Sequence, residues 1–198
     1  IIHSHGKGAS LLGRFMSFFT KLPHVYTYHG IHLETLNSLN KFIYLKYEKL
    51  TKFIDYVKIF VSESEKSFAF DNKFISNKSY FRIISNGIIN FEINPYLKKR
   101  IREKIRNKYK ISKNDALIVN VSRLVDQKNL FELIEICNLL KKTKFIVLGE
   151  GDLFEKLSNE IKRRNINNLL FIGKVNNVND FLVASDVYLS TSFYEGHP

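Results

Sequence analysis

The sequence lacks most of the features that would make it a disulfide-bonded, membrane-spanning or low-complexity protein. It contains a single cysteine, Cys137, so a disulfide within the chain is excluded, and we expect this side chain to pack in a core. Its longest apolar runs have the length of a strand, far below the roughly eighteen residues that a membrane span needs. The chain opens with no signal-peptide pattern and shows no biased segment or repeat period. We therefore expect a globular protein that is cytoplasmic or peripheral on the inner face of the plasma membrane.

Acidic residues are scarce in the first part of the chain. Residues 1–110 carry 20 basic and 8 acidic side chains, whereas residues 111–198 carry 11 of each, so the net charge of +12 belongs to one half. Much of it lies at 98–110, where Ile101, Ile105 and Tyr109 recur every four residues on an otherwise charged helix. This helix is either a solvated face with a thin apolar seam or a surface attracted to anionic lipid or an anionic acceptor. Nucleic acid is not an expected partner, because Tyr109 alone interleaves an aromatic ring with these cations.

Apolar runs of strand length alternate with segments of helical period along the whole chain. Strands are predicted at 24–28, 56–61, 81–85, 116–121, 144–148, 169–172 and 187–189, and helices at 8–20, 36–53, 63–70 and 98–110 among others. This alternation predicts an α/β fold of two Rossmann-like domains with parallel sheets. A change of composition at 90–96 predicts a boundary between residues 1–95 and 96–198, with the two domains facing each other across a cleft. Both domains are expected to be incomplete, since the chain begins and ends inside predicted elements.

Polar and flexible residues follow the predicted strands of the second half, where ligands of parallel sheets bind. Arg123 and Lys128 follow the strand at 116–121, and Asp126 between them is a predicted cap for the next helix. Glycines at 149, 151 and 173 follow the next two strands. Cations in a loop at a helix start favour a phosphate. The pattern predicts a pocket for a ligand with a polyanionic and a polyhydroxyl part, such as a nucleotide-sugar.

Several segments together resemble the retaining glycosyltransferases of the GT-B fold, family 4 (group 1) type, which build bacterial polysaccharides. In the second half they are residues 121–129, 147–151, 171–173, 184–187 and 190–198, the last ending Ser-Phe-Tyr-Glu-Gly-His-Pro. In the first half, residues 26–30 resemble the family's Thr-x-His-Gly segment, residues 60–63 its strand-to-serine turn and residues 84–88 its Asn-Gly-Ile loop. Each piece alone is unspecific, whereas five in order with the expected spacing are a strong signal.

The resemblance implies roles for individual residues. It implies that Arg123 and Lys128 hold the donor diphosphate, that Glu195 lies beside the sugar hydroxyls, and that His29 reaches the reacting carbon. It also implies that backbone groups near Gly173 and Val175 meet the base. Further donor-binding positions are Gly149, Gly151, Ser192 and Gly196. No metal or other cofactor is expected, because the chain contains no Asp-x-Asp pair to hold a divalent ion.

The implied function is transfer of a sugar from a UDP-linked or GDP-linked donor to a hydroxyl of a glycan or lipid-linked acceptor, with retention at the anomeric carbon. The family's second motif glutamate would follow residue 198, and its early Gly-rich loop would precede residue 1. The stretch of 198 residues alone is therefore expected to be inactive. Two alternatives remain at this point: a nonhydrolysing nucleotide-sugar epimerase of the same fold, and a basic module that binds RNA or a membrane without catalysis.

Residues 11–21 place large apolar side chains beside basic ones on a predicted helix. Such a helix can lie in the headgroup layer of an anionic membrane. The alternative is an ordinary α/β helix whose core-facing stripe consists of Leu12, Phe15, Met16 and Phe19.

Overall fold

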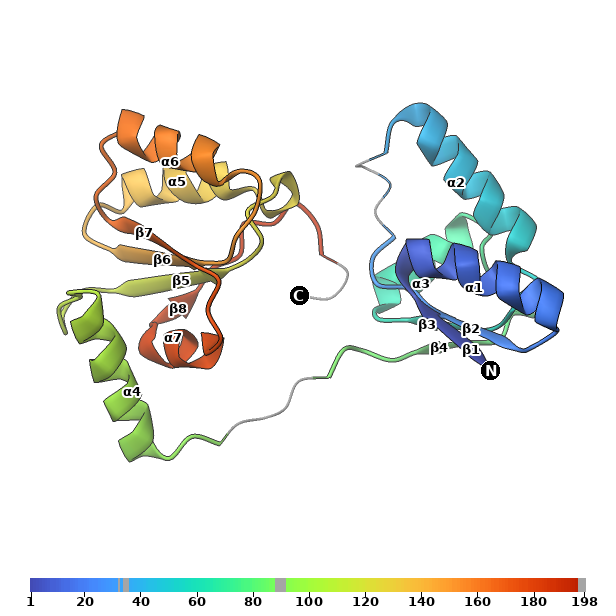
Figure 1. The fold of residues 1–198 in the computed structure, drawn as a ribbon, viewed down its shortest axis with the longest axis horizontal. Coiled ribbons are helices and arrows are strands. Elements are labelled where there is room, and N and C mark those ends of the chain that lie inside the picture. Colours follow the sequence, from blue (N-terminus) through green and yellow to red (C-terminus); the bar gives the residue numbers. More distant parts are fainter. Residues whose placement is uncertain (32, 34–35, 88–91, 196–198) are drawn as a thin grey trace. The chain divides into compact units, whose positions relative to one another are not determined.

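The computed structural model describes residues 1–31, 33, 36–87 and 92–195. By their internal contacts, the described residues up to 87 form one compact unit and residues 92–194 form a second. Each unit has a four-stranded, wholly parallel sheet covered by helices (Figure 1). The predicted α/β class with two parallel sheets is confirmed. Within the described residues, no helix combines the length and the apolar character that crossing a membrane requires.

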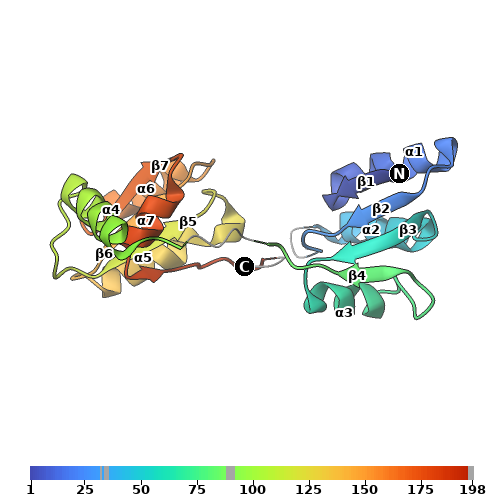
Figure 2. The ribbon, with the colours of Figure 1, turned by 90° about the horizontal axis from the view of Figure 1, so that it is seen from below.

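The first unit contains four strands in sequential order, β1-β2-β3-β4 (Figure 2). Its strands are β1 (Ile2–His5), β2 (His24–Thr27), β3 (Asp55–Phe60) and β4 (Phe81–Ile83). Its helices are α1 (Gly6–Thr20), α2 (Ser38–Thr51) and α3 (Glu63–Asp71). Ser62 caps α3, since its side chain accepts a hydrogen bond from the backbone N–H of Glu65. All these elements lie within a few residues of their predicted positions.

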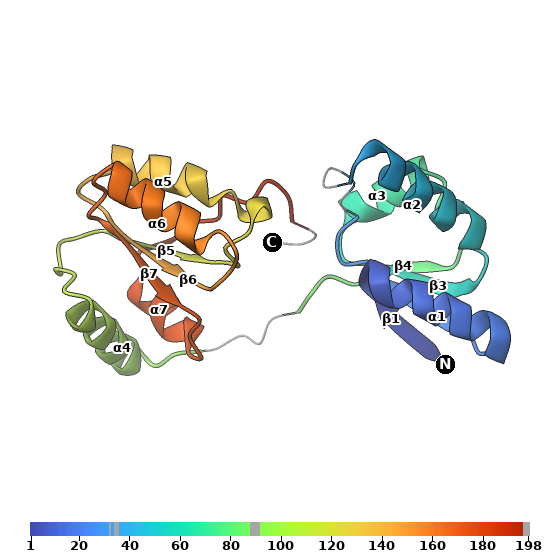
Figure 3. The same ribbon diagram turned by 45° about the horizontal axis from the view of Figure 1, so that its top comes forward.

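All three helices of this unit pack on the same face of the sheet (Figures 1 and 3). Alternate residues of β2 point to this face, because successive side chains of a strand point to opposite sides. Tyr26 and Tyr28 lie there with Phe60 of β3, and residues of α2 and α3 complete the same core. Helix α1 covers the part of the face that carries His24 and Tyr26, where the guanidinium of Arg14 lies 5.1 Å from the Tyr26 ring centroid.

Helix α1 buries its small and polar residues and exposes its large apolar ones. Its buried residues, at helical spacing, are Ser10, Gly13, Arg14 and Ser17. The residues predicted as a core-facing stripe are instead exposed: Leu12 by 60%, Phe15 by 62%, Met16 by 46% and Phe19 by 66%. That alternative was wrong, because the face that contacts the sheet is selected by polar partners and not by hydrophobicity.

Those partners form a buried ionic network centred on Asp55 at the start of β3. Arg14 donates to both carboxylate oxygens of Asp55 (2.8 and 2.6 Å) and to Glu48 of α2 (2.9 Å). Asp55 also contacts His24 Nδ1 at 2.7 Å and Lys58 Nζ at 3.2 Å. Burial alone raises the pKa of Asp55, but the hydrogen bonds from His24 and Arg14 outweigh it and lower the pKa to about 2. The carboxylate is therefore ionised and ties β3 to α1 and β2.

The second unit has the strand order β7-β6-β5-β8, in which β5 and β6 are central. Its strands are β5 (Leu117–Val121), β6 (Lys144–Leu148), β7 (Leu169–Gly173) and β8 (Val187–Tyr188). Its helices are α4 (Pro95–Lys108), the short 3₁₀ helix η1 (Asp126–Lys128), α5 (Leu130–Leu139), α6 (Phe154–Arg163) and α7 (Val178–Ala184). Helices α5 and α6 cover one face of the sheet, and α4 and α7 cover the other (Figure 1). Cys137 is buried in the first of these two cores, as predicted.

The basic helix predicted at 98–110 is α4, which docks onto α7. Ile105 is buried, and the ring of Tyr109 packs on Phe181. Arg102 donates to the carbonyl of Ala184 (2.8 Å) and to the carboxylate of Asp186 (2.5 Å). The apolar seam is thus confirmed, and part of the positive charge of this helix is used within the unit.

Gly13 brings the backbone of α1 close to the sheet. A Cβ atom at this position would lie 2.6 Å from His24 Nε2 and 2.8 Å from Ser4 Oγ, two buried atoms that hydrogen-bond to each other. We predict that Gly13→Ala lowers the free energy of unfolding by about 1–3 kcal/mol, as overpacking does, despite the better helix propensity of alanine. Urea denaturation measures the change. Gly8→Ala is the matched control, because a Cβ atom there meets nothing within 4 Å; equal losses in the two variants would contradict the packing argument.

Candidate functional site

The loops that follow β5 and β6 are joined by backbone hydrogen bonds. The N–H of Ser122 donates to the carbonyl of Leu148 (3.0 Å), and the N–H of Leu124 donates to the carbonyl of Glu150 (3.0 Å). These bonds extend the parallel pairing of the two strands beyond their ends. The loop that contains Arg123 is therefore fixed on the carboxyl edge of the sheet.

Two glycines permit this close approach. A Cβ atom on Gly149 would lie 2.0 Å from the carbonyl oxygen of Ser122, and one on Gly151 would lie 2.4 Å from that of Leu124. Gly149 also has a φ of +134°, which side-chain-bearing residues rarely adopt. Its N–H donates to the carbonyl of Gly173 (2.9 Å), so one glycine connects the ends of β5, β6 and β7. The physical role of these predicted donor-binding glycines is close backbone packing.

A pocket of about 450 Å³ opens at this carboxyl edge. Its volume lies in the range of small-molecule sites. The residues that line it are Val121, Ser122, Arg123, Leu148, Gly149, Glu150, Lys174, Val175 and Val178. Apolar side chains thus form much of its wall, while two cations and one carboxylate supply charge. Such a wall suits a flat base next to a charged group.

The side chain of Glu150 is positioned across the pocket. Its Oε1 atom accepts a long hydrogen bond from the backbone N–H of Lys174 (3.4 Å), just after the positive-φ turn at Gly173. Sequence reasoning noted Gly173 and Val175 but not the side chains of Glu150 and Lys174. The sequence signal that could have identified Glu150 and Lys174 was their position directly after glycines at the ends of two neighbouring strands.

Helix η1 holds the segment after β8 beside the Arg123 loop. The N–H of Phe193 donates to the carbonyl of Gln127 (3.0 Å), and Gln127 Nε2 donates to the carbonyl of Tyr194 (3.0 Å). The hydroxyl of Thr191 donates to the carbonyl of Lys128 (2.9 Å). Lys128 and the segment at 191–194 are therefore neighbours, although 63 residues separate Thr191 from Lys128 in sequence.

Asp126 does not cap α5, contrary to the prediction. It begins η1, and the residue before α5 is Asn129, which has a left-handed φ of +47° and makes no side-chain cap. The 3₁₀ turn separates Asp126 from the helix and points the carbonyls of Gln127 and Lys128 at the segment after β8.

The remaining predicted residues fall in different places. Ser192 lies in the segment held by η1, where its hydroxyl accepts a hydrogen bond from Ser190 (3.3 Å). Glu195 directly follows Tyr194 and is exposed. Gly196 lies outside the described residues. His29 belongs to the first unit, where its Nε2 atom lies 2.8 Å from Nδ1 of His5. Among the residues that the structure describes, no group of His, Cys, Asp or Glu is arranged to hold a metal ion.

Asn120 was also missed by sequence reasoning. It is buried in β5, where its Nδ2 donates to the carbonyl of Leu189 (2.8 Å) and its Oδ1 accepts from Ser122 (2.7 Å). A polar residue inside an otherwise apolar strand was the available signal. Its two bonds link the Arg123 loop to the end of β8.

Comparisons with known proteins agree with this geometry. Residues 101–198 match the family model described as glycosyl transferases group 1. In solved structures the whole chain is similar to HepE of Anabaena, crystallised with UDP and glucose, with a TM-score of 0.75 at 20% identity over 96% of this chain and 53% of that one. Sucrose-phosphate synthase of Thermosynechococcus elongatus gives a TM-score of 0.77 at 14% identity, over 99% of this chain and 51% of that one. These likenesses show the fold, which is of the GT-B type.

Two curated relatives extend the comparison. An uncharacterized glycosyltransferase of Methanocaldococcus jannaschii is 29% identical over 80% of this chain and 39% of its own length. The UDP-Gal:alpha-D-GlcNAc-diphosphoundecaprenol alpha-1,3-galactosyltransferase of Escherichia coli is 26% identical over 100% of this chain and 53% of its own. The chain thus spans about half the length of these relatives or less. Through residues 101–198 it belongs to the group 1 glycosyl transferase family.

Gly149 supplies a test of the site's construction. We predict that Gly149→Ala lowers the melting temperature by several degrees and abolishes stabilisation by a nucleotide, because a Cβ atom 2.0 Å from a backbone carbonyl must separate the two loops. Thermal denaturation with and without UDP or GDP measures both effects. Gly8→Ala, the same change at an open position, is the control. Retained nucleotide stabilisation in Gly149→Ala would contradict the role assigned to the close approach.

Proposed function

We propose that the full-length protein transfers a sugar from a UDP-linked or GDP-linked donor to a hydroxyl of a glycan or lipid-linked acceptor, with retention and without a metal ion. The observation that carries this proposal is the pocket at the ends of β5–β7, which combines an apolar wall with Arg123 and Lys174 in the region that matches the family. The base would lie against the apolar wall near Val175, and the diphosphate near Arg123 and Lys128.

Fixed positive charge has a chemical role in such a reaction. When the bond to the sugar breaks, negative charge grows on the departing diphosphate, and cations already in position stabilise it without reorganisation. Arg123 and Lys128 would serve this purpose where other enzymes use a divalent ion. Glu195 would accept hydrogen bonds from the sugar hydroxyls, since a carboxylate can accept several at once. His29 would lie beside the anomeric carbon.

The basic helix offers little support for the rival RNA-binding reading. Arg102 and Arg106 of α4 are hydrogen-bonded to backbone carbonyls and to Asp186 within the second unit. A cation held in this way loses part of its attraction for a phosphate backbone. The epimerase alternative would share the pocket, and the family match of residues 101–198 favours the transferase over it.

The donor site gives the first test. We predict that UDP or GDP raises the melting temperature of the full-length protein. Arg123→Ala should lower the affinity for this nucleotide about 10- to 100-fold, as loss of a charge-assisted hydrogen bond does. Arg163→Ala is the matched control, because this exposed arginine pairs with Glu160 on its own helix α6. Unchanged affinity in Arg123→Ala would contradict the assignment.

Sugar transfer that persists in EDTA supports the metal-free reaction, and its loss would contradict it.

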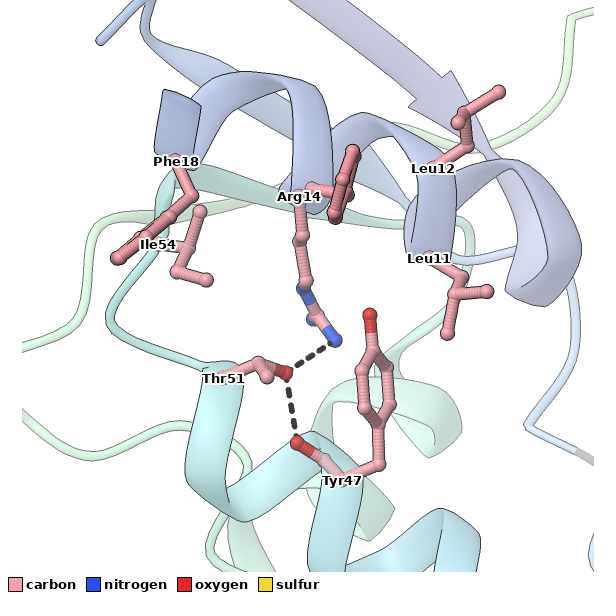
Figure 4. A pocket seen from close by; sticks show the side chains of 8 residues that line it. Leu11, Leu12, Arg14, Phe18, Tyr47, Thr51 and Ile54 are labelled. Atoms are coloured by element: carbon pink, nitrogen blue, oxygen red, sulfur yellow. Dashed lines mark hydrogen bonds between the residues drawn. The ribbon is translucent and has the colours of Figure 1, made fainter. Parts of the chain in front are cut away.

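We propose further that the first unit, which would bind the acceptor, docks on an anionic membrane through α1 and α2. Exposed apolar side chains of α1 include Leu11, Phe15, Phe18 and Phe19. A pocket of about 460 Å³ between the two helices continues this apolar surface, with Tyr47, Thr51 and Ile54 opposite α1 (Figure 4). Helix α1 contains no acidic residue, and Glu48, the acidic residue of α2, is fully buried. The charges that these helices expose are therefore lysines, which complement anionic headgroups.

Flotation with liposomes tests the membrane surface. We predict that the full-length protein floats with vesicles that contain anionic lipid. Phe15→Ser and Phe19→Ser should each lower this binding about tenfold, since each removes one exposed aromatic side chain that would enter the lipid layer. Leu139→Ser is the control, because Leu139 is a 79% exposed apolar residue of the second unit. Binding that depends neither on anionic lipid nor on the phenylalanines would remove the proposal and leave the donor site unaffected.

A further inference from the structure

Strands β1 and β2 bring two histidines together at their carboxyl ends. The strands are parallel neighbours in which His3 pairs with Val25 and His5 pairs with Thr27. His5 ends β1, and His29 follows β2 by two residues. The next residue after each histidine, Gly6 or Gly30, has a positive φ, so the chain turns away and leaves the ring at the edge of the sheet.

The two rings are directly hydrogen-bonded. Nδ1 of His5 lies 2.8 Å from Nε2 of His29, and the ring planes are inclined by 22°. On the other side of His5, the His3 ring lies 4.3 Å away between centroids, and its own Nε2 bonds to the hydroxyl of Thr27 (2.8 Å). The rings of His5 and His29 are both exposed, so substrate and solvent protons can reach them.

A hydrogen bond between two imidazole nitrogens contains one proton. The neutral pair satisfies this condition. A pair that gains one proton also satisfies it, because a charged ring can donate to its neutral neighbour. A second proton places N–H groups face to face and breaks the bond. The bond between the two rings therefore survives the gain of one proton and is lost with the gain of two.

We propose that His5 is a positioning residue for His29, holding its ring through the Nδ1···Nε2 bond, which persists as long as the pair gains no more than one proton. This inference rests on the proposed function, in which His29 lies beside the anomeric carbon. Positive charge develops at that carbon in the transition state, so a neutral ring is favourable there and an imidazolium would repel it.

The other groups around the pair act in the same direction. Burial lowers the pKa of His3, and the positive charges that His5, His24 and His29 can carry lower it further. His24 of β2 is buried and bonded to the Asp55 carboxylate. Lys7 stands at the start of α1, close in sequence to His5. A second proton on the His5–His29 pair would thus be repelled by the positive charges of neighbouring groups, which disfavours double protonation of the pair.

The test compares two replacements of His5 in the full-length protein. We predict that His5→Ala lowers kcat about 10- to 100-fold with the donor KM changed less than about twofold, because it loosens a group beside the reacting atoms and not the donor site. In His5→Asn the amide occupies the place of Nδ1 and recovers most of kcat at alkaline pH. In both variants the acid limb of the pH–kcat profile moves from its wild-type position, because neither replacement can take up a proton within the pair.

Controls separate this inference from the proposed function. His3→Ala, which removes the ring bonded to Thr27, should leave kcat and the acid limb within about twofold of wild type. An NMR titration of the His29 ring, which needs no activity, should give a different protonation curve in His5→Ala from that in wild type, because the bonded ring is absent. Identical His29 titrations, or a wild-type profile in His5→Ala, would overturn the inference. If Arg123→Ala loses activity while His5→Ala keeps it, the transferase function stands and the pair fails.

Discussion

The first unit depends on the buried ion pairs and hydrogen bonds of the Asp55 carboxylate. It joins β3 to α1 through Arg14 and to β2 through His24, and Arg14 in turn reaches Glu48 of α2. Removing one partner of such a buried network leaves a charge without compensation, which destabilises by about 3–5 kcal/mol. Because Asp55 pairs with His24 in the register of β3 and β2, the network fixes the amino-terminal ends of these strands beneath α1.

In the second unit the loops at the strand ends are held in place by backbone contacts and not by buried charges. Gly149 and Gly151 bring the loops after β5 and β6 within hydrogen-bonding distance, and η1 holds the segment after β8 beside them. The side chain of Arg123 therefore starts from a fixed backbone, although the side chain itself is exposed. A preorganised backbone that carries an exposed cation suits a phosphate that arrives from solvent and must leave again.

Most of the fold could be predicted from the sequence, because the period of apolar residues is a local property. The strands of both sheets and helices such as α1 and α4 lie close to their predicted positions. The glycines and cations at the ends of β5, β6 and β7 could be named, since strand ends are visible in the pattern. The pairing of His5 with His29 could not be predicted, because these residues are 24 positions apart in the sequence and meet only through the register of two strands. The cap predicted at Asp126 was wrong because a 3₁₀ turn separates this residue from α5, and the apolar period that marks the helix does not reveal such a turn.

The orientation of α1 shows most clearly why local pattern was not enough. Its apolar residues would favour burial, at about 1.5–3 kcal/mol for each large side chain. Rotating the helix to bury Phe15 and Phe19, however, would withdraw Arg14 from Glu48 and Asp55 and leave two buried carboxylates without their guanidinium partner. That loss, several kcal/mol for each buried charge, exceeds the gain from two phenylalanines. The partners of Arg14 lie 34 and 41 residues away, so no window along the helix contains them. The apolar surface of α1 is therefore a consequence of the ionic core, because the same contacts that order the sheet turn these side chains outward.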